Sequence, residues 1–410
     1  EFLLAIKERD FWKKKSAKSK SITDWAVFKE KRNQVNNMKC RLKQEFYNES
    51  LSRDKTNPKK LWKSLKNLVP DDKTSTTTVK RVVHDGTEET HPKKIANVFN
   101  KFFVTVGSSL ASKFTSDTTS INPPVNISEF AFAPISQTNV EKLVMELKND
   151  KATGPDGVGS RLLKAGSPVL SHILSIIFSK SLEKGYVPRC WKTKRVSPIF
   201  KTGSKIDPSN YRPISILPIP MKVFEKIIHK QVADFIFQHS FLNDRQSGFR
   251  KMYSTTSAVL DVSDFILKQL DENNFVGAVL IDFKKAFDTV DHSILLKKLW
   301  CLGFRDVSFE WFESYLSDRY QKTLINNTES DLLQEDVYGV PQGSVLGPLL
   351  FLIYINDLHS VIKNSFCHLY ADDTIIVSSA KSVDTLISTL EDDLARVDQW
   401  LQNNKMTINM

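Results

Sequence analysis

Apolar residues in the last two thirds of the chain alternate between helical spacing and short unbroken runs. Apolar side chains that recur every three or four positions predict amphipathic helices. They occupy residues 140–147, 221–239, 254–270, 293–302 and 383–401. Short apolar runs that predict strands occupy residues 196–200, 275–283, 366–370 and 374–378, and the second of these is expected to be buried. Residues 348–358 predict a buried helix, and residues 323–338 are expected to contain a hairpin. Helices interspersed with strands predict an α/β or α+β arrangement.

The first third of the chain has a different pattern. Residues 1–66 are basic and carry widely spaced aromatics. Apolar side chains recur there at spacings near three, four and seven, at Trp25, Phe28, Val35, Met38, Leu42 and Phe46. This spacing predicts one or more amphipathic helices. Residues 67–135 are rich in Thr, Ser, Asn and Pro, which indicates a linker with one short helix near residues 93–110.

The net charge of the chain lies at one end. The whole chain carries +11, and residues 1–66 alone hold 19 Lys and Arg against 8 Asp and Glu. The remaining 344 residues are therefore neutral overall. A basic block of this kind favours an anionic partner, of which nucleic acid is the commonest. The candidate nucleic-acid contacts are Lys13, Lys14, Lys15, Lys31 and Arg32. The alternative is a solvated helix face.

Other features of the composition exclude several classes of protein. No stretch of 18 uncharged apolar residues is present, so no membrane span is expected. The four cysteines are far apart and form no CxxC pair, which indicates neither a thiolate zinc site nor a secreted disulfide scaffold. An intracellular protein is expected. Because the chain begins with Glu1 and stops at Met410 within a predicted element, we expect it to be part of a longer protein.

Three carboxylates stand at the ends of apolar strands. Asp282 ends one strand, and Asp372 and Asp373 separate two others. A carboxylate in such a place is costly to bury unless it is paired or binds a metal. Oxygen ligands of this kind suit Mg²⁺, and two such ions promote in-line phosphoryl transfer. The alternative is a common turn and a helix cap that never meet, because periodicity does not bring Asp282 to Asp372.

The order of motifs along the chain resembles that of the reverse transcriptases of non-LTR (LINE-type, jockey-like) retrotransposons. The blocks that carry the resemblance are KATGPDGV at residues 151–158, WKTKRVSPIFK at 191–201, NYRPIS at 210–215, RQSGFR at 245–250, LIDFKKAFDTV at 280–290, GVPQGSVLGP at 339–348 and YADD at 370–373. The resemblance covers roughly residues 136–410, and the basic segment before them resembles the corresponding region more loosely.

The resemblance implies roles for individual residues. Asp282 and Asp372 would hold two Mg²⁺ ions, with Mn²⁺ as an alternative, and Asp373 and the backbone carbonyl of Phe283 would be auxiliary ligands. Around the incoming deoxynucleotide, Lys201 and Arg212 would bind the triphosphate, Phe287 would exclude a 2′-hydroxyl, and Gln342 and Gly343 would lie beside the nucleotide. Asp288, Asp291 and Asn356 are expected to be caps or structural partners.

The resemblance also implies an architecture and partners. It predicts the fingers and palm of a right-hand polymerase, with fingers at residues 136–270, a palm with an antiparallel sheet at 271–400, and the start of the palm-to-thumb segment at 401–410. A thumb is expected to be missing. The implied partners are an RNA template, a DNA primer or target, and deoxynucleotides. An upstream endonuclease, target-primed reverse transcription, and a cytoplasmic ribonucleoprotein that enters the nucleus are implied by the family alone.

Two alternatives to this interpretation remain open. One is a decayed or domesticated element that binds nucleic acid without catalysis. The other is a different right-hand polymerase, such as a group II intron, retron or RNA-dependent RNA polymerase. The aromatic Phe287 and the NYRPIS spacing at residues 210–215 favour the non-LTR group over these.

Overall fold

The computed structural model describes residues 1–57, 61–62, 79–114 and 128–409. They belong to two compact units, Glu1–Thr77 and Thr78–Met410, and each unit is described by itself. The expected boundary between residues 66 and 67 lies outside the described residues.

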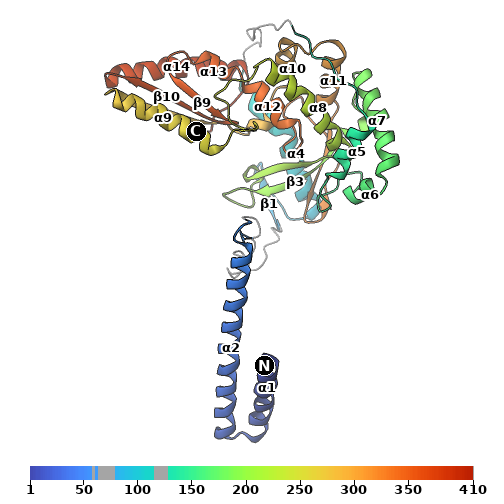
Figure 1. Cartoon of the computed structure of the whole chain (residues 1–410), viewed down its shortest axis with the longest axis vertical. Coiled ribbons are helices and arrows are strands. Elements are labelled where there is room, and N and C mark those ends of the chain that lie inside the picture. The colour runs from blue at the N-terminus through green and yellow to red at the C-terminus, as the bar shows by residue number, and fades with distance from the viewer. Residues whose placement is uncertain (58–60, 63–78, 115–127, 410) are drawn as a thin grey trace. The chain divides into compact units, whose positions relative to one another are not determined.

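Residues 1–57 of the smaller unit contain two long helices, α1 (Phe2–Ser19) and α2 (Ile22–Asp54) (Figure 1). The chain reverses between them at Lys20, which has a φ of 53°. The prediction of helices is confirmed, but the predicted amphipathic face is only partly formed. Phe28 and Val35 are buried, whereas Trp25 and Phe46 are 47% and 64% exposed. Length accounts for the exposure of Phe46, because the 18 residues of α1 can cover only the first part of the 33-residue α2.

Three sheets lie in the described part of the larger unit. The first pairs β1 (Val82–His84) with β2 (Thr87–Glu89). The second has the order β4 (Tyr211–Ile216), β3 (Thr193–Phe200), β6 (Tyr320–Ile325) and β7 (Thr328–Glu329), with β8 (Leu333–Gln334) also paired to β6. It is mixed, because β3 and β6 run parallel. The third has the order β5 (Phe275–Asp282), β10 (Asp373–Ala380) and β9 (Phe366–Tyr370) and is antiparallel throughout. The predicted strands and the hairpin within 323–338 are therefore present.

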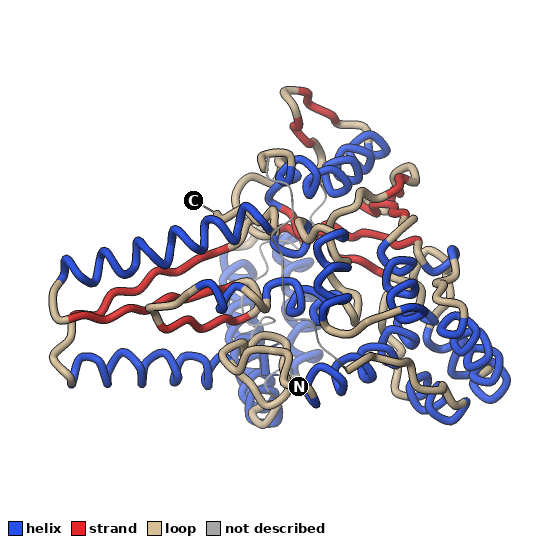
Figure 2. The backbone as a smooth tube through the Cα atoms, turned by 90° about the horizontal axis from the view of Figure 1, so that it is seen from above, coloured by secondary structure: helices blue, strands red, loops and turns tan. Residues whose placement is uncertain are grey.

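Helices α9 (Thr255–Asp271) and α14 (Val383–Asn403) lie along opposite faces of the antiparallel sheet (Figures 1 and 2). A Cβ on Gly277 would lie 3.2–3.3 Å from two leucines of α14, and the ring of Phe265 on α9 stacks on Phe366 of β9. The expectation that β5 is buried is wrong. β5 is an edge strand, and Leu280, on the face away from α14, is 78% exposed.

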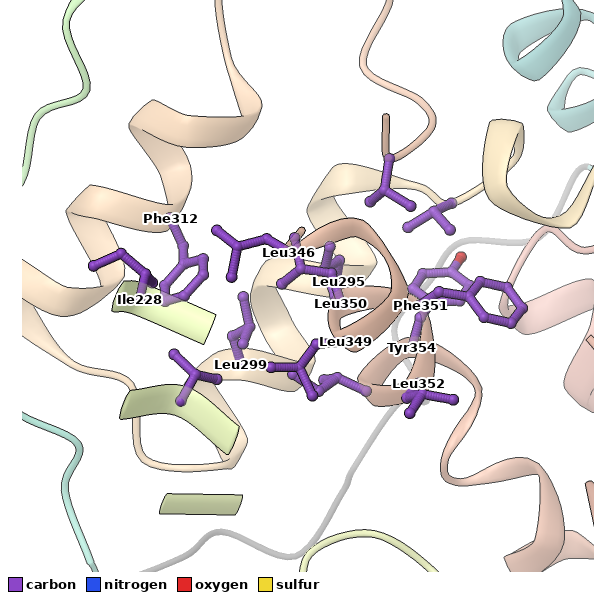
Figure 3. Close-up of a cluster of buried hydrophobic side chains, with 14 of the residues drawn as sticks. Ile228, Leu295, Leu299, Phe312, Leu346, Leu349, Leu350, Phe351, Leu352 and Tyr354 are labelled. Atoms are coloured by element: carbon purple, nitrogen blue, oxygen red, sulfur yellow. The ribbon is translucent and has the colours of Figure 1, made fainter. Parts of the chain in front are cut away.

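The other helices of the larger unit enclose one apolar core. They are α5 (Gln137–Met145), α6 (Ser160–Ala165), α7 (Ser167–Glu183), α8 (Ile219–Gln238), α10 (His292–Cys301), α11 (Asp306–Leu316), α12 (Gly347–Ile355) and α13 (Leu358–Val361). α12 lies at the centre of the core, since eight of its nine residues are buried. A helix that is apolar on all sides requires such a position. Figure 3 shows α12 side chains packed with Leu295 and Leu299 of α10, Ile228 of α8 and Phe312 of α11. None of the described helices has both the length and the apolar composition that a bilayer span requires.

The helix expected near residues 93–110 is present as α4 (Pro92–Ala111), but it packs into the larger unit and is not part of a linker. It is a 20-residue helix, and its buried face packs on β6 of the mixed sheet. Phe99 is fully buried, with its ring edge-on to Tyr211 of β4 at 4.9 Å between centroids. A Cβ on Gly107 would lie 2.4 Å from the carbonyl oxygen of Asp288, so the helix approaches that backbone at a distance that only glycine permits. Residues 79–114 are therefore part of the larger unit's fold.

We predict that Phe99→Ala lowers the free energy of unfolding of the larger unit by about 3–5 kcal/mol, the usual cost of removing a buried aromatic ring. The measurement is amide hydrogen exchange of peptides that contain Trp311, which lies in the main core of that unit. Phe11→Ala is the control, because Phe11 is 61% exposed on α1. Equal exchange rates in the two variants would show that α4 is not an integral part of the fold.

Candidate active site

The antiparallel sheet brings the three candidate carboxylates to one end. Asp282 is the last residue of β5 and Asp373 the first of β10, and the two are direct partners in the β5–β10 register. Side chains in directly opposed positions have Cβ atoms about 4.5–5.5 Å apart. On the other side, Asp373 is paired with Tyr370, so Ala371 and Asp372 form the two-residue turn between β9 and β10. The sequence alone left open whether Asp282 meets the Asp372–Asp373 pair, and the register shows that it does.

The proximity of the three carboxylates disfavours the ionised form of Asp372. Burial raises its pKa, the negative charges of Asp373 and Asp282 raise it further, and Arg212 partly offsets them. In the described part of the chain, no three His, Cys, Asp or Glu side chains converge closely enough to enclose a metal ion by themselves. The donor set nevertheless fits Mg²⁺, which takes one or two carboxylates and completes its shell with waters and phosphate oxygens.

An open cavity of about 660 Å³ lies beside these carboxylates. It contains every residue that the motifs singled out for metal or nucleotide binding, apart from Asp373, which adjoins it. The residues concerned are Asp282, Phe283, Asp372, Lys201, Arg212, Phe287, Gln342 and Gly343. They come from four segments that lie far apart in the sequence, and the fold gathers them on one surface.

The wall of the cavity formed by β3 and β4 is basic. Lys201 follows β3 and Arg212 lies on β4, and both side chains are exposed. A third cation, Lys285, was not among the predicted residues. Its ammonium group donates to the backbone carbonyls of Ser209 at 2.8 Å and Tyr211 at 3.1 Å. Burial lowers the pKa of Lys285, and the neighbouring charges of Lys201 and Arg212 contribute to this. The cavity therefore has an acidic end and a basic side.

Comparison with known proteins shows the family of this chain. Residues 199–410, about half of the chain, match the family described as reverse transcriptase (RNA-dependent DNA polymerase). The chain belongs to the reverse transcriptase family.

Individual relatives belong to mobile elements. The probable RNA-directed DNA polymerase from transposon BS of Drosophila melanogaster is 32% identical over 288 residues, which make up 67% of this chain and 32% of that protein. The RNA-directed DNA polymerase from mobile element jockey of the same organism is 29% identical over 283 residues, 67% and 31% of the two chains. A polyprotein from type-1 retrotransposable element R2 of Popillia japonica is 28% identical over 230 residues, 55% and 30% of the two chains. The chain thus spans about a third of the length of these relatives, and the resemblance to non-LTR reverse transcriptases is confirmed.

Phe287, which lines the cavity, has two aromatic neighbours. Its ring stacks on Phe351 of α12 at 4.6 Å between centroids and meets Phe249 edge-on at 6.0 Å. Phe287 is only partly buried and also lines the cavity. It is therefore at once a core residue and a wall of the site, because its position is set by the fully buried α12.

The loop before α12 contacts two other elements, β4 and α8. Gly343 has a φ of 104°, and a Cβ there would lie 2.8 Å from the carbonyl oxygen of Ser215 on β4. A side chain is therefore excluded on both counts. The backbone N–H of Val345 donates to Glu225, a fully buried carboxylate of α8 that also accepts from Tyr315. Burial raises the pKa of Glu225 despite these hydrogen bonds. No feature of the sequence pattern marks Glu225 as a support for this loop.

Asp288 orients Gln342. The side-chain amide of Gln342 donates to Asp288 Oδ1 at 2.9 Å, while Asp288 Oδ2 has essentially no accessible surface and no hydrogen-bond partner among the described residues. The residue as a whole is partly exposed, but its carboxylate is enclosed. Burial raises the pKa of Asp288 to about 6. The hydrogen bond from Gln342 is consistent with the expected role of Asp288 as a structural partner. The same expectation is confirmed for Asp291, which caps α10, and for Asn356, which bonds to the backbone of Phe241.

Asn409 was also absent from the predicted residues. Its side chain donates to Asp282 Oδ2 at 3.1 Å, and its backbone N–H donates to the Asp282 carbonyl oxygen at 2.7 Å. Phe283 and Ile408 form an antiparallel bridge beside it. The last described residues therefore lie against the candidate metal ligand Asp282.

We predict that Asp288→Asn raises the free energy of unfolding at pH 7.5 by about 1–3 kcal/mol. The folded-state pKa of Asp288 is above its ordinary value, so folding favours the protonated form. That stabilisation is complete below about pH 4 and is lost as the pH rises through 6, where the buried carboxylate ionises. The asparagine avoids this cost and can still accept from Gln342.

Urea unfolding at pH 7.5 and pH 4.5 measures the difference, which should shrink at the lower pH. Asp392→Asn, an exposed position on α14, is the control and should show no such dependence. An equal effect of Asp288→Asn at both pH values would contradict the assignment of a raised pKa.

Proposed function

We propose that this chain is the polymerase region of an RNA-directed DNA polymerase of a non-LTR retrotransposon, which copies element RNA into DNA. The observation that carries the proposal is the register that opposes Asp282 to Asp373 at one end of a cavity whose other wall holds Lys201, Arg212 and Lys285. An acidic end suits divalent cations, and a basic wall suits a triphosphate. Two of the relatives named above bear the name RNA-directed DNA polymerase, and the family match at residues 199–410 includes this site.

Each residue of the cavity has a role in this proposal. Asp282 and Asp372 hold Mg²⁺, with Asp373 and the Phe283 carbonyl as auxiliary ligands. Bound Mg²⁺ would activate the primer 3′-hydroxyl and stabilise the leaving pyrophosphate. Lys201 and Arg212 bind the triphosphate of the deoxynucleotide, Arg212 through its planar fork and Lys201 as a point charge. Lys285, held by two carbonyl groups, adds a third positive charge on the same side.

The remaining groups shape the nucleotide site. Phe287, backed by Phe351, leaves no room for a 2′-hydroxyl and so selects deoxynucleotides. Gln342 faces the nucleotide with its amide orientation set by Asp288. Gly343 allows the loop backbone to approach closely. These groups act by position and charge, which is the main contribution of a protein to phosphoryl transfer.

The polymerase subdomains follow from the same proposal. Residues 136–270 correspond to the fingers and 271–400 to the palm, whose antiparallel sheet is β5–β10–β9. α4 would add to the mixed sheet, in which β3 and β4 come from the fingers segment and β6 from the palm segment. Target-primed reverse transcription, and an endonuclease elsewhere in the parent polyprotein, would complete the activity of the whole element.

A decayed element that only binds nucleic acid is the second candidate. Loss of a metal ligand or of a triphosphate contact would favour it. Asp282, Asp372, Asp373, Lys201 and Arg212 are all present, and the four segments that carry the predicted residues line one cavity. The geometry therefore favours an active enzyme.

We predict that Asp372→Asn reduces primer extension on an RNA template, with deoxynucleotides and Mg²⁺, by at least about 100-fold. The same change should not destabilise the fold, because burial and two neighbouring carboxylates disfavour the charge of Asp372. Asp392→Asn is the control. Extension by the Asp372→Asn variant at the unmodified rate would refute the proposed function, and reduced stability would show that lost activity has another cause.

The basic smaller unit is proposed to bind RNA or target DNA. Lys13, Lys14 and Arg32 are exposed on its two helices. Lys31 forms an ion pair with Glu8 at 2.8 Å and Lys15 with Asp24 at 3.5 Å. Surface ion pairs of this kind are weak, so a phosphate can replace either carboxylate. All five predicted residues therefore stay available to a nucleic acid backbone.

We predict that the affinity of the chain for single-stranded RNA falls steeply with KCl, and that Lys13→Gln with Lys14→Gln lowers the slope of log affinity against log salt by about 1.4. Two neutralised phosphate contacts at about 0.7 each give this value. Fluorescence anisotropy at several KCl concentrations measures it. The matched control is Lys184→Gln with Lys363→Gln, two exposed lysines of the larger unit. A salt-independent affinity, or an equal change in the control, would contradict this role.

A further inference from the structure

The turn that carries Asp372 has a backbone conformation that its residue type does not favour. Ala371 and Asp372 are the two central residues of the β9–β10 hairpin, and Ala371 has a φ of 56°. Asp372 is not among the residues with positive φ. Two-residue hairpins with positive φ at the first central position usually place glycine there, because a Cβ is strained in that conformation. Something outside the hairpin must therefore hold Ala371 in place.

Gln246 provides that support. Its side-chain Oε1 accepts from the backbone N–H of Ala371 at 2.9 Å and from that of Gly248 at 2.8 Å. Gln246 is only 2% exposed, so these hydrogen bonds are shielded from water. The oxygen is the only side-chain atom of Gln246 that can accept two N–H groups, which fixes the orientation of the amide. We propose that Gln246 is a positioning residue that holds the Ala371–Asp372 turn, so that Asp372 meets Asp282 in the metal site; this inference rests on the proposed function.

The backbone around Gln246 is attached to the same hairpin. The N–H of Ser247 donates to the Leu369 carbonyl at 2.8 Å, and the N–H of Leu369 donates to the Arg245 carbonyl at 2.9 Å. These two bonds fix the register between the segment 245–248 and β9. Gly248 closes the contact, because a Cβ there would lie 2.2 Å from the N atom of Ala371 and 2.7 Å from its Cα. The approach of the two backbones thus requires glycine at 248.

A second set of side chains secures the same strand. Ser247 Oγ lies 3.0 Å from His368 Nε2, and His368 Nδ1 lies 2.8 Å from Asp261 Oδ2 on α9. The arrangement of serine, histidine and carboxylate has the order of a hydrolase triad, but Ser247 and His368 are 3% and 5% exposed and have no access to a substrate. The three groups instead tie β9 to α9 and to the segment that contains Gln246.

The contacts of segment 245–248 hold Asp372 in position but do not involve the residues proposed to bind the triphosphate. Lys201 and Arg212 belong to the mixed sheet, and none of the contacts of segment 245–248 described above reaches them. Loss of the Gln246 acceptor would leave two buried N–H groups without a partner and release the strained turn. The expected consequence is a displaced Asp372 with an intact triphosphate wall.

The decisive variant is Gln246→Met, which keeps the length of the side chain and removes the acceptor. We expect at least a 10-fold fall in kcat for primer extension, a KM for deoxynucleotide within about 2-fold of the unmodified value, and at least a 5-fold weaker binding of Mn²⁺ by paramagnetic resonance of the free ion. Gln231→Met is the control. Gln231 also exchanges two hydrogen bonds with a backbone, that of Ala133, but does not line the cavity. It should leave all three quantities unchanged.

Amide hydrogen exchange tests the inference without relying on activity. In the unmodified protein the peptide that contains residues 369–374 should be protected at Ala371, and Gln246→Met should abolish that protection while Gln246→Glu, which keeps an acceptor oxygen, retains it. An Ala371 amide that exchanges freely in the unmodified protein would overturn the inference, even if Gln246→Met failed to fold. Unchanged kcat and Mn²⁺ affinity in Gln246→Met would also overturn it, whereas primer extension that survives Asp372→Asn would refute the proposed function itself.

Discussion

The pairing of β10 with β5 is the constraint on which the site depends. It places Asp373 directly opposite Asp282 and leaves Asp372 in the adjoining turn. Because side chains alternate between the faces of a strand, a slip of one residue would move every apolar side chain of β10 to the other face. The buried Ile376 and the contact between Gly277 and α14 oppose such a slip. The packing of α14 on the sheet thus fixes the geometry of the carboxylates, although α14 supplies none of them.

The proximity of three carboxylates is electrostatically unfavourable by itself. Two groups, Arg212 and Asn409, partly offset the repulsion. Burial and, to a smaller extent, repulsion by Asp373 and Asp282 raise the pKa of Asp372. Arg212 acts in the opposite direction from the mixed sheet, and Asn409 donates a hydrogen bond to Asp282. A divalent cation would offset the repulsion far more strongly than these groups do. The protein therefore assembles a site whose charge favours the ligand that the proposed reaction needs.

Much of this could be predicted from the sequence, and the limits have physical causes. The positions of the helices and strands follow from hydrophobic periodicity, and the candidate ligands follow from motif order. Hydrophobic periodicity does not show which strands pair with each other. The pairing of Asp282 with Asp373 is therefore visible only in the structure. Lys285, Glu225 and Gln246 act through contacts with backbone groups of distant segments, and such contacts leave no mark in local spacing. The apolar run of residues 275–283 predicts a buried strand, although β5 is at the edge, because an edge strand and a central strand can have the same apolar run.

The central helix α12 explains why segments so far apart form one cavity. Phe351 backs Phe287, and the hydroxyl of Tyr354 donates to the carbonyl of Asn404 at 2.6 Å. The second contact fixes the start of the segment that ends with Asn409 on Asp282. The loop before α12 holds Gly343 against Ser215 of the mixed sheet. A helix buried on all sides can move only if the whole core repacks. The nucleotide wall, the aromatic wall and the segment beside the metal ligands are therefore held at fixed separations by one element that contributes no charged group to the site.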